Sequence, residues 1–200
     1  MSWCFNSQTP KKMPPIERHP WEPFIPEGTR IIFLGSFPPA RHRWSMDFFY
    51  PNYINDFWRV MGICFYNDKN YFVDEENKTF RRKLIEEELT ARGIGIYDTA
   101  YEVRRTKNTA SDKDLEVVTV TDFDHLFNLA PQCHTVVTTG LKATENLATH
   151  SQLPLPKVGQ SVDFSFYDRP MRLYRMPSTS RAYPMALEKK AEIYAKIFEV

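Results

Sequence analysis

The stretch "RIIFLGSFPPARHRW", residues 30–44, decides the fold. It begins as a short apolar run, passes into Gly-Ser-Phe-Pro-Pro and ends in a basic, aromatic segment. A short apolar run that is bounded by Gly and Pro predicts a buried strand. The two prolines force extended backbone, so the chain leaves this strand as a stiff ledge that can line a pocket.

Around this strand, short apolar runs alternate with helical stretches, which is typical of an α/β sheet covered by helices. We expect core strands at residues 31–35, 94–98, 134–140 and 171–176. We expect helices at residues 54–65, 78–93, 121–131, 142–150 and 185–200. Gly93 is a plausible C-terminal stop, and Thr121 a plausible N-cap. The pattern predicts a three-layer αβα sandwich with a central, mainly parallel four-stranded sheet.

The N-terminal segment differs from the rest of the chain in its proline content. Residues 1–29 hold six prolines, so a regular helix or a central strand is excluded there. We expect an extended arm that packs on the body through Trp21 and Phe24. Residues 30–200 then form a single domain.

Composition narrows the classes of function. The chain has 200 residues, 42% of them hydrophobic, and a net charge of +1, which argues against a strongly basic surface but allows a local basic patch. Its three cysteines form no CxxC pair and its five histidines show no metal-ligand spacing. We therefore expect no metal, no iron-sulfur cluster and no other cofactor. With no apolar targeting or membrane-spanning segment in sight, we expect a cytoplasmic monomer.

The predicted sheet places a ligand site at the carboxyl ends of its strands. The loops that we expect there are residues 36–53, residues 99–113, the turn at Gly140 and residues 177–184. Residues 41–58 hold seven aromatic side chains, mixed with two arginines. Aromatic faces beside cations favour the binding of bases and phosphates, although core filling is the simpler interpretation for Phe57 and Trp58.

Three motifs resemble those of one protein family. "LGSFPPA" followed by "FFYPNYINDFWRVMG" resembles the first motif of the uracil-DNA glycosylase superfamily, and "YRMPSTSRAY" resembles its second motif. "GIGIYDTA" resembles a segment of the hypoxanthine-DNA glycosylase branch. The resemblance covers roughly residues 30–198, and it is nearest to this branch and to the mismatch-specific (G:T/U) branch.

The chain departs from the mismatch-specific branch at two positions. Phe37 stands where that branch has a catalytic Asn, and Met176 replaces the His or Asn of the second motif. The hypoxanthine branch instead uses the Asn of N-x-F-W, which corresponds to Asn55. The resemblance thus implies Asn55 as a catalytic residue, and we expect Asn55→Ala to abolish cleavage without unfolding the chain. Asp98 is a second catalytic candidate, with a capping role as the alternative.

The resemblance implies a monofunctional DNA N-glycosylase that flips out and hydrolytically excises uracil or hypoxanthine in base-excision repair, with DNA as its partner. Tyr50, or else Phe49, would stack on the base, and backbone amides from Gly35 to Phe37 would face its anion. The implied substrate-binding residues are Gly35, Ser36, Phe37, Pro38, Phe49 and Tyr50. The implied DNA-binding residues are Pro177, Ser178, Thr179, Ser180 and Arg181.

Two other functions stay open at this point. The first is a DNA-damage-binding module that kept the pocket and lost hydrolysis, as the residues at positions 37 and 176 suggest. The second is a hydrolase of nucleotides or nucleosides, because αβα sheets host many such enzymes. The basic cluster Arg104, Arg105 and Lys107 is either a DNA contact or a solvated surface.

Overall fold

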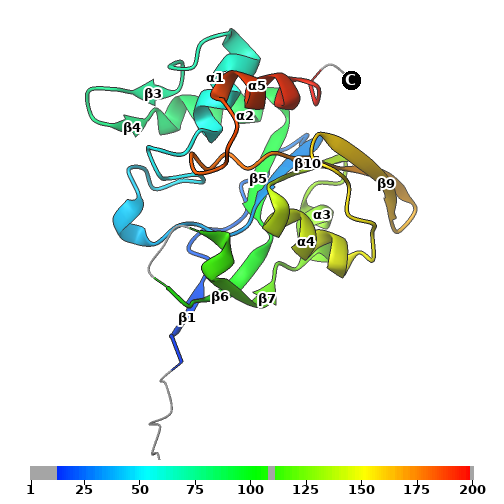
Figure 1. The fold of residues 1–200 in the computed structure, drawn as a ribbon. Coiled ribbons are helices and arrows are strands. Elements are labelled where there is room, and N and C mark those ends of the chain that lie inside the picture. Colours follow the sequence, from blue (N-terminus) through cyan, green and yellow to red (C-terminus); the bar gives the residue numbers. More distant parts are fainter. Residues whose placement is uncertain (1–12, 108–110, 199–200) are drawn as a thin grey trace, which may run out of the picture.

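The computed structural model describes residues 13–107 and 111–198 (Figure 1). The helices are α1 (Phe57–Tyr66), α2 (Arg82–Arg92), α3 (Phe123–Leu129), α4 (Leu141–His150) and α5 (Leu187–Ala195). The strands are β1 (Ile16–Arg18), β2 (Ile31–Gly35), β3 (Val73–Asp74), β4 (Thr79–Phe80), β5 (Ile94–Asp98), β6 (Ala100–Arg105), β7 (Leu115–Val120), β8 (Thr135–Thr139), β9 (Gln160–Phe166) and β10 (Arg169–Met176). Residues 1–12 of the predicted arm and residues 199–200 of the predicted last helix lie outside the described residues.

The central sheet has five strands in the order β5-β2-β8-β10-β9. The four predicted core strands are all present and lie parallel to one another. The predicted count of four is corrected to five, because β9 pairs with β10 in antiparallel orientation. The side chains of β9 are exposed or only half-buried, so its sequence "QSVDFSF" lacks the apolar run that marks a core strand.

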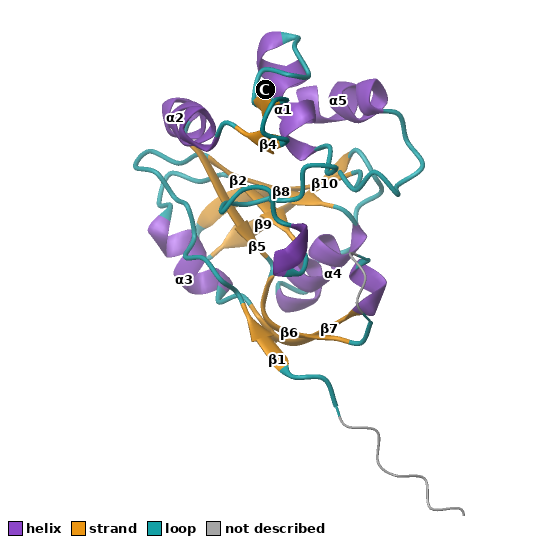
Figure 2. Ribbon diagram, turned by 90° about the vertical axis from the view of Figure 1, so that its left-hand side faces the viewer, coloured by secondary structure: helices purple, strands orange, loops and turns teal. Residues whose placement is uncertain are grey.

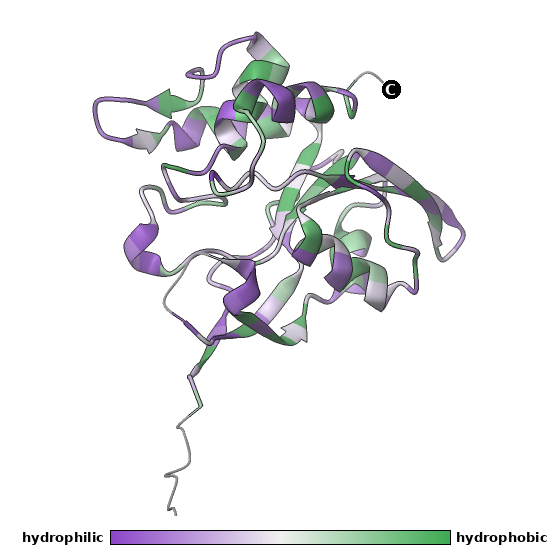
Figure 3. Ribbon diagram, in the orientation of Figure 1, coloured by the Kyte–Doolittle hydropathy of each residue, from purple (hydrophilic) through white to green (hydrophobic). Residues whose placement is uncertain are grey.

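Helices lie on both faces of this sheet. Figures 1 and 2 show α1, α2 and α5 on one side and α3 and α4 on the other. In Figure 3 the hydrophobic colour gathers on the central strands, while α1 and α5 carry both colours. The side chains of Phe33, Val136 and Leu173, from three neighbouring strands, are at most 1% exposed. Burial of these strands on both faces explains their nearly continuous apolar sequences.

The ends of two helices test the predicted boundaries. Gly93 ends α2 in the left-handed conformation with φ 64°, as predicted. The predicted start at residue 78 was wrong, because Thr79–Phe80 forms β4, which pairs with β3. The prediction that Thr121 caps α3 was also wrong. Asp122 accepts the hydrogen bond from the backbone N–H of His125, while the Thr121 hydroxyl donates to the carbonyl of Asp98.

A second sheet joins the N-terminal segment to the body. It has the strand order β1-β6-β7, so the prediction of a loop over residues 99–113 was wrong for residues 100–105. Residues 108–110 of that range lie outside the described residues. β1 is an edge strand that pairs with β6, and Phe24 forms an isolated bridge with Ile96 of β5. Backbone pairing with β6 and with β5 therefore holds the described part of the N-terminal segment against the body.

The order of the strands reverses at the carboxyl end of β2. β2 has β5 on one side and β8 on the other. The connection from β2 to β5 contains α1 and α2, whereas α3 lies in the connection from β5 to β8, on the opposite side of the sheet in Figure 2. In open α/β sheets, ligands bind at the carboxyl ends of the strands, at the point where the strand order reverses. In the described residues, no helix is long and apolar enough to cross a membrane.

Candidate active site

Gly35, the last residue of β2, lies opposite Asp98, the last residue of β5. A Cβ atom on Gly35 would collide with the Oδ1 atom of Asp98 and would lie 3.1 Å from the Tyr50 hydroxyl. Only glycine leaves room for this approach. Because Gly35 has no side chain, the Asp98 carboxylate and the Tyr50 hydroxyl can both approach the end of β2.

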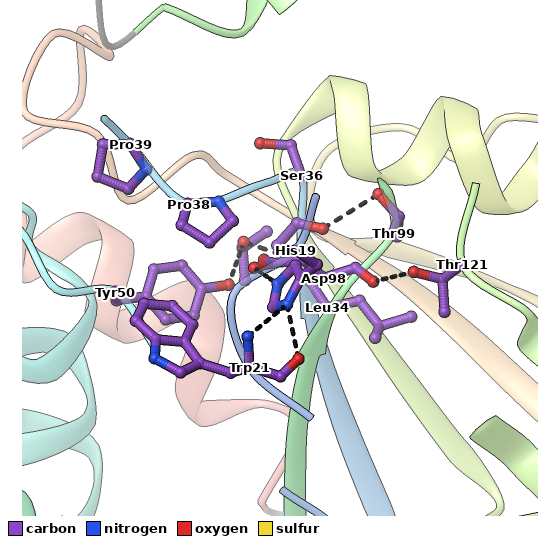
Figure 4. Close-up of polar contacts among 12 residues, drawn as sticks. His19, Trp21, Leu34, Ser36, Pro38, Pro39, Tyr50, Asp98, Thr99 and Thr121 are labelled. Carbon is purple, nitrogen blue, oxygen red and sulfur yellow. Dashed lines mark hydrogen bonds and ion pairs between the residues drawn. The ribbon is translucent and has the colours of Figure 1, made fainter. Parts of the chain in front are cut away.

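Asp98 is buried, with 6% of its surface exposed, and it is held from two sides. Its Oδ2 atom lies 2.9 Å from Nε2 of His19, whose Nδ1 lies 2.8 Å from the carbonyl oxygen of Trp21 (Figure 4). The backbone carbonyl of Asp98 accepts a 2.7 Å hydrogen bond from the Thr121 hydroxyl. The predicted candidate Asp98 thus shares its carboxylate with a histidine from the N-terminal segment, which the sequence analysis did not single out.

Tyr50 is fixed by its ring and by its hydroxyl. The ring stacks on Phe57 with 3.8 Å between centroids, and the hydroxyl lies 2.6 Å from the Thr139 hydroxyl at the end of β8. Its backbone is left-handed with φ 50°, which is rare for a bulky residue and frequent at functional sites. Burial, and then the nearby Asp98, raise the pKa of Tyr50 well above its ordinary value. The phenol is therefore neutral at physiological pH.

A second carboxylate approaches the same strand end. The Ser36 hydroxyl donates a 2.6 Å hydrogen bond to Asp112. Burial raises the pKa of Asp112, and Asp98 raises it further, while the hydrogen bond from Ser36 lowers it. No sequence pattern marks Asp112, because it lies in a polar segment without a motif. Only its partner Ser36 stood in a recognisable pattern.

The backbone carbonyls of Pro38 and Pro39 are both held by hydrogen bonds from side chains. The Pro38 carbonyl accepts a 2.6 Å hydrogen bond from Arg105, which also forms a 3.0 Å ion pair with Glu17. The Pro39 carbonyl accepts a 2.7 Å hydrogen bond from the Trp44 indole. Arg105, a member of the predicted basic cluster, is thus engaged in holding the ledge in place. Figure 4 shows Pro38 beside the Tyr50 ring and the cluster around Asp98.

Phe37 and Phe49, both predicted substrate contacts, are largely buried. Phe37 is 9% exposed, and its ring meets His19 edge-on at 5.6 Å between centroids. Phe49 is 2% exposed and packs between Trp21, Phe48 and other rings of the core. Of the two predicted aromatic platforms, Tyr50 is thus the one that is bound to polar groups at the sheet edge.

Asn55, the other catalytic candidate, caps a helix. Its Oδ1 atom accepts a 2.9 Å hydrogen bond from the backbone N–H of Phe57, in the first turn of α1. Because the Tyr50 ring stacks on Phe57, the structure brings Asn55 and Tyr50 to the same residue. The carboxamide oxygen of Asn55 accepts this hydrogen bond, so the group that could act on a ligand is its NH₂, a hydrogen-bond donor.

The loop of the second motif contacts both α4 and α5. Ser178 lies against Gly140, and the Pro177 carbonyl accepts a 2.8 Å hydrogen bond from Tyr194. Thr179 is 2% exposed, and its carbonyl accepts from the backbone N–H of Asp56. The remaining two predicted residues, Ser180 and Arg181, are half-buried and exposed, respectively. Thr179 thus fastens the loop, while Arg181 reaches solvent.

The arrangement unites residues from five parts of the chain in one polar cluster, hereafter the Asp98 cluster. It comprises His19, Gly35, Tyr50, Asp98 and Thr139. Within the residues that the structure describes, no group of three or more His, Cys, Asp or Glu side chains could hold a metal ion. The chemistry that these residues themselves can supply is hydrogen bonding, aromatic stacking and proton transfer at a carboxylate.

An α/β protein with a polar cluster at the carboxyl end of a mainly parallel sheet is thus the class that fold and site define. No protein-family model and no curated protein matches the chain, while 28 chains of solved structures do. One is the solution NMR structure of a "putative Uracil DNA glycosylase" from Methanosarcina acetivorans. It is 21% identical, with a TM-score of 0.59, over 92% of this chain and 99% of that chain. The chain therefore has the fold of that protein.

Proposed function

We propose that this protein is a DNA glycosylase that hydrolyses the N-glycosidic bond of a deaminated base, uracil or hypoxanthine, in base-excision repair. The observation that carries the proposal is the Asp98 carboxylate, buried beside the Tyr50 hydroxyl at the carboxyl end of β2. The shared fold with a protein described as a "putative Uracil DNA glycosylase" supports it, as do the three motifs, each of which includes the carboxyl end of a strand of the central sheet.

In this proposal Asp98 acts on the attacking water. Breaking the bond sends its electrons to the base and leaves a cationic sugar, which a nearby carboxylate stabilises. The water oxygen then bonds to the anomeric carbon, and its proton passes to the Oδ1 atom of Asp98. The departed base takes its proton from solvent. Two contacts support this role for Asp98: Oδ2 is held by His19, and Oδ1 lies beside Gly35.

The base itself would be held by rings and amides. Tyr50 supplies a ring whose other face is backed by Phe57, so it would stack on an extruded base without moving. The Asn55 NH₂ group and the backbone amides from Gly35 to Phe37 would donate hydrogen bonds to the base as negative charge develops on it. Pro38 would close one side of the slot.

The loop at residues 177–181 would grip the DNA backbone. Ser178 and Ser180 carry hydroxyls suited to phosphate oxygens, and the exposed Arg181 would contact a phosphate or fill the space that the base leaves. Thr179 and Pro177 would act indirectly, by holding the loop on α1 and α5 through their carbonyls.

A base-release assay tests the function. DNA duplexes that carry one uracil, one hypoxanthine or only matched bases are incubated with the protein, and alkali-labile abasic sites are counted. We expect strand breaks at uracil or hypoxanthine only, and none with an Asp98→Asn control. Binding to the modified duplexes without breaks would instead identify a damage-binding module. Activity restricted to free nucleosides would identify a nucleoside hydrolase.

A further inference from the structure

We propose that His19 is a positioning residue for Asp98, so that the N-terminal segment completes the active site. This inference rests on the proposed function, because it assigns a role within the same site. It concerns a residue outside the three motifs, 79 positions before its partner in the sequence. Its role is to hold one carboxylate oxygen of Asp98 so that the other stays beside Gly35.

Both ring nitrogens of His19 have hydrogen-bond partners. Nδ1 lies 2.8 Å from the carbonyl oxygen of Trp21 and 3.3 Å from its backbone N–H. Nε2 lies 2.9 Å from Oδ2 of Asp98. Because a carboxylate oxygen only accepts, Nε2 is the donor in this contact when Asp98 is ionised.

The ring of His19 cannot turn away from this contact. Its side chain has no exposed surface, and four aromatic rings surround it. These rings belong to Trp21, Phe37, Phe49 and Tyr97, with centroid distances of 4.5–6.0 Å. A buried polar ring in such a cage is stable only while both nitrogens are hydrogen-bonded. The cage and the two hydrogen bonds therefore lock the imidazole in one orientation.

The locked imidazole orients the carboxylate of Asp98. Because Oδ2 is bound to Nε2, the planar carboxylate directs Oδ1 toward Gly35 and the Tyr50 hydroxyl. Without His19, a buried carboxylate would lose its main partner and rotate to find another donor. Misplacement of a reacting group by about 1 Å costs on the order of 100-fold in rate. The loss would affect the rate of bond cleavage and not the affinity for DNA, since the His19 side chain has no exposed surface with which to touch DNA.

Two conservative variants separate positioning from mere packing. In His19→Gln the amide nitrogen reaches the place of Nε2, so a donor to Asp98 is retained. In His19→Asn the amide reaches only the place of Nδ1, so the contact with Trp21 is retained and the contact with Asp98 is lost. Arg18→Ala is the matched control on the same segment, since Arg18 is exposed and pairs with Glu102.

The measurement is the single-turnover rate of base excision against duplex concentration, below the unfolding temperature of every variant. We expect His19→Asn to lower the maximal rate roughly 100-fold with an unchanged half-saturating concentration. We expect His19→Gln to stay within about ten-fold of the wild type and Arg18→Ala to match it. Should His19→Asn fail to fold, His19→Gln alone decides, and a loss of about 100-fold or more overturns the proposal.

The failures of the two proposals are distinguishable. A wild-type chain that releases no base from any duplex overturns the glycosylase function, and the role of His19 with it. An active wild type with an equally active His19→Asn variant overturns only the role of His19. A packing role would make His19→Asn the better variant, because it keeps the hydrogen bond to Trp21.

Discussion

Two buried aspartates in this molecule, Asp56 and Asp98, each bind a buried basic side chain through one carboxylate oxygen. They differ in what surrounds the other oxygen. Lys190 and Asp56 lie 134 residues apart in the sequence, with 2.9 Å between Nζ and Oδ2. His19 and Asp98 lie 79 residues apart, also at 2.9 Å. In both pairs the cationic or imidazole side chain has no exposed surface, so each pair joins distant segments across the core.

The two carboxylates differ in their second oxygen. Oδ1 of Asp56 faces a further cation, Arg181, at 3.6 Å, and Lys190 also donates to the Ser180 carbonyl. Oδ1 of Asp98 instead lies beside Gly35, where no side chain fits. The Asp56 pair therefore fastens the second-motif loop to the start of α1, whereas the Asp98 pair directs an oxygen toward Gly35 at the end of β2. Burial and ion pairing are therefore not enough to distinguish a catalytic carboxylate from a structural one. The surroundings of the second carboxylate oxygen distinguish the two.

The largest expected effect is on the excision rate, and it follows from a substitution of Asp98. Asp98→Asn keeps the volume and removes the base, so we expect the excision rate to fall roughly 1,000-fold. The stability should change little by comparison. Single-turnover rates and thermal melts of the same preparation check this. A variant with wild-type rates would exclude Asp98 from the reaction.

The matching substitution in the Asp56 pair should lower the stability of the fold instead of the excision rate. Lys190→Met preserves the volume but leaves Asp56 buried with only the more distant Arg181. Breaking a buried pair from one side costs about 3–5 kcal/mol, so we expect a loss of unfolding free energy in that range. Urea unfolding measures it. The excision rate at saturating duplex should stay near the wild-type value, and a collapse of that rate in folded protein would contradict the distinction.

Asn55 has a capping oxygen and an NH₂ group, and two variants separate them. Asn55→Asp keeps the oxygen that caps α1 but has no NH₂ donors, so we expect loss of cleavage with retained stability. Asn55→Ala removes both groups and should also lower the unfolding free energy by about 1 kcal/mol. Thermal melts and excision rates measure the two effects. Full activity of Asn55→Asp would show that the amide has no role in the reaction.

The smallest expected effect is on the pH dependence of stability, and it concerns Asp112, which binds Ser36 just after β2. The raised pKa of Asp112 means that its charged form is disfavoured in the folded state. Its contribution to stability is therefore lost as the pH rises from the ordinary carboxyl range through the raised folded pKa. Asp112→Asn still accepts from Ser36 and escapes this loss. We expect it to gain less than about 1 kcal/mol over the wild type at neutral pH, and nothing at acidic pH.

Urea unfolding at both pH values measures this difference. An equal or lower stability of Asp112→Asn at neutral pH would show that burial of the charge at position 112 costs nothing.

Local sequence patterns determined most of the architecture. The apolar runs at 31–35 and 94–98 marked neighbouring buried strands, and Gly93 marked the end of α2, because periodicity and glycine conformation are local properties. They also placed Gly35 and Asp98 at one edge of the sheet, since parallel strands end together. β9 escaped prediction because its exposed side chains carry no apolar signal.

Only the tertiary structure decided which groups meet at that edge. His19 reaches Asp98 because β1 docks on β6, and Asp112 reaches Ser36 from a segment with no motif. The catalytic and binding roles of Asn55, Asp98 and the second-motif loop remain predictions. Sequence reports how deeply each residue prefers to be buried, since that depends on its own side chain. A hydrogen bond between residues 79 positions apart depends on how whole segments pack, and no local pattern records it.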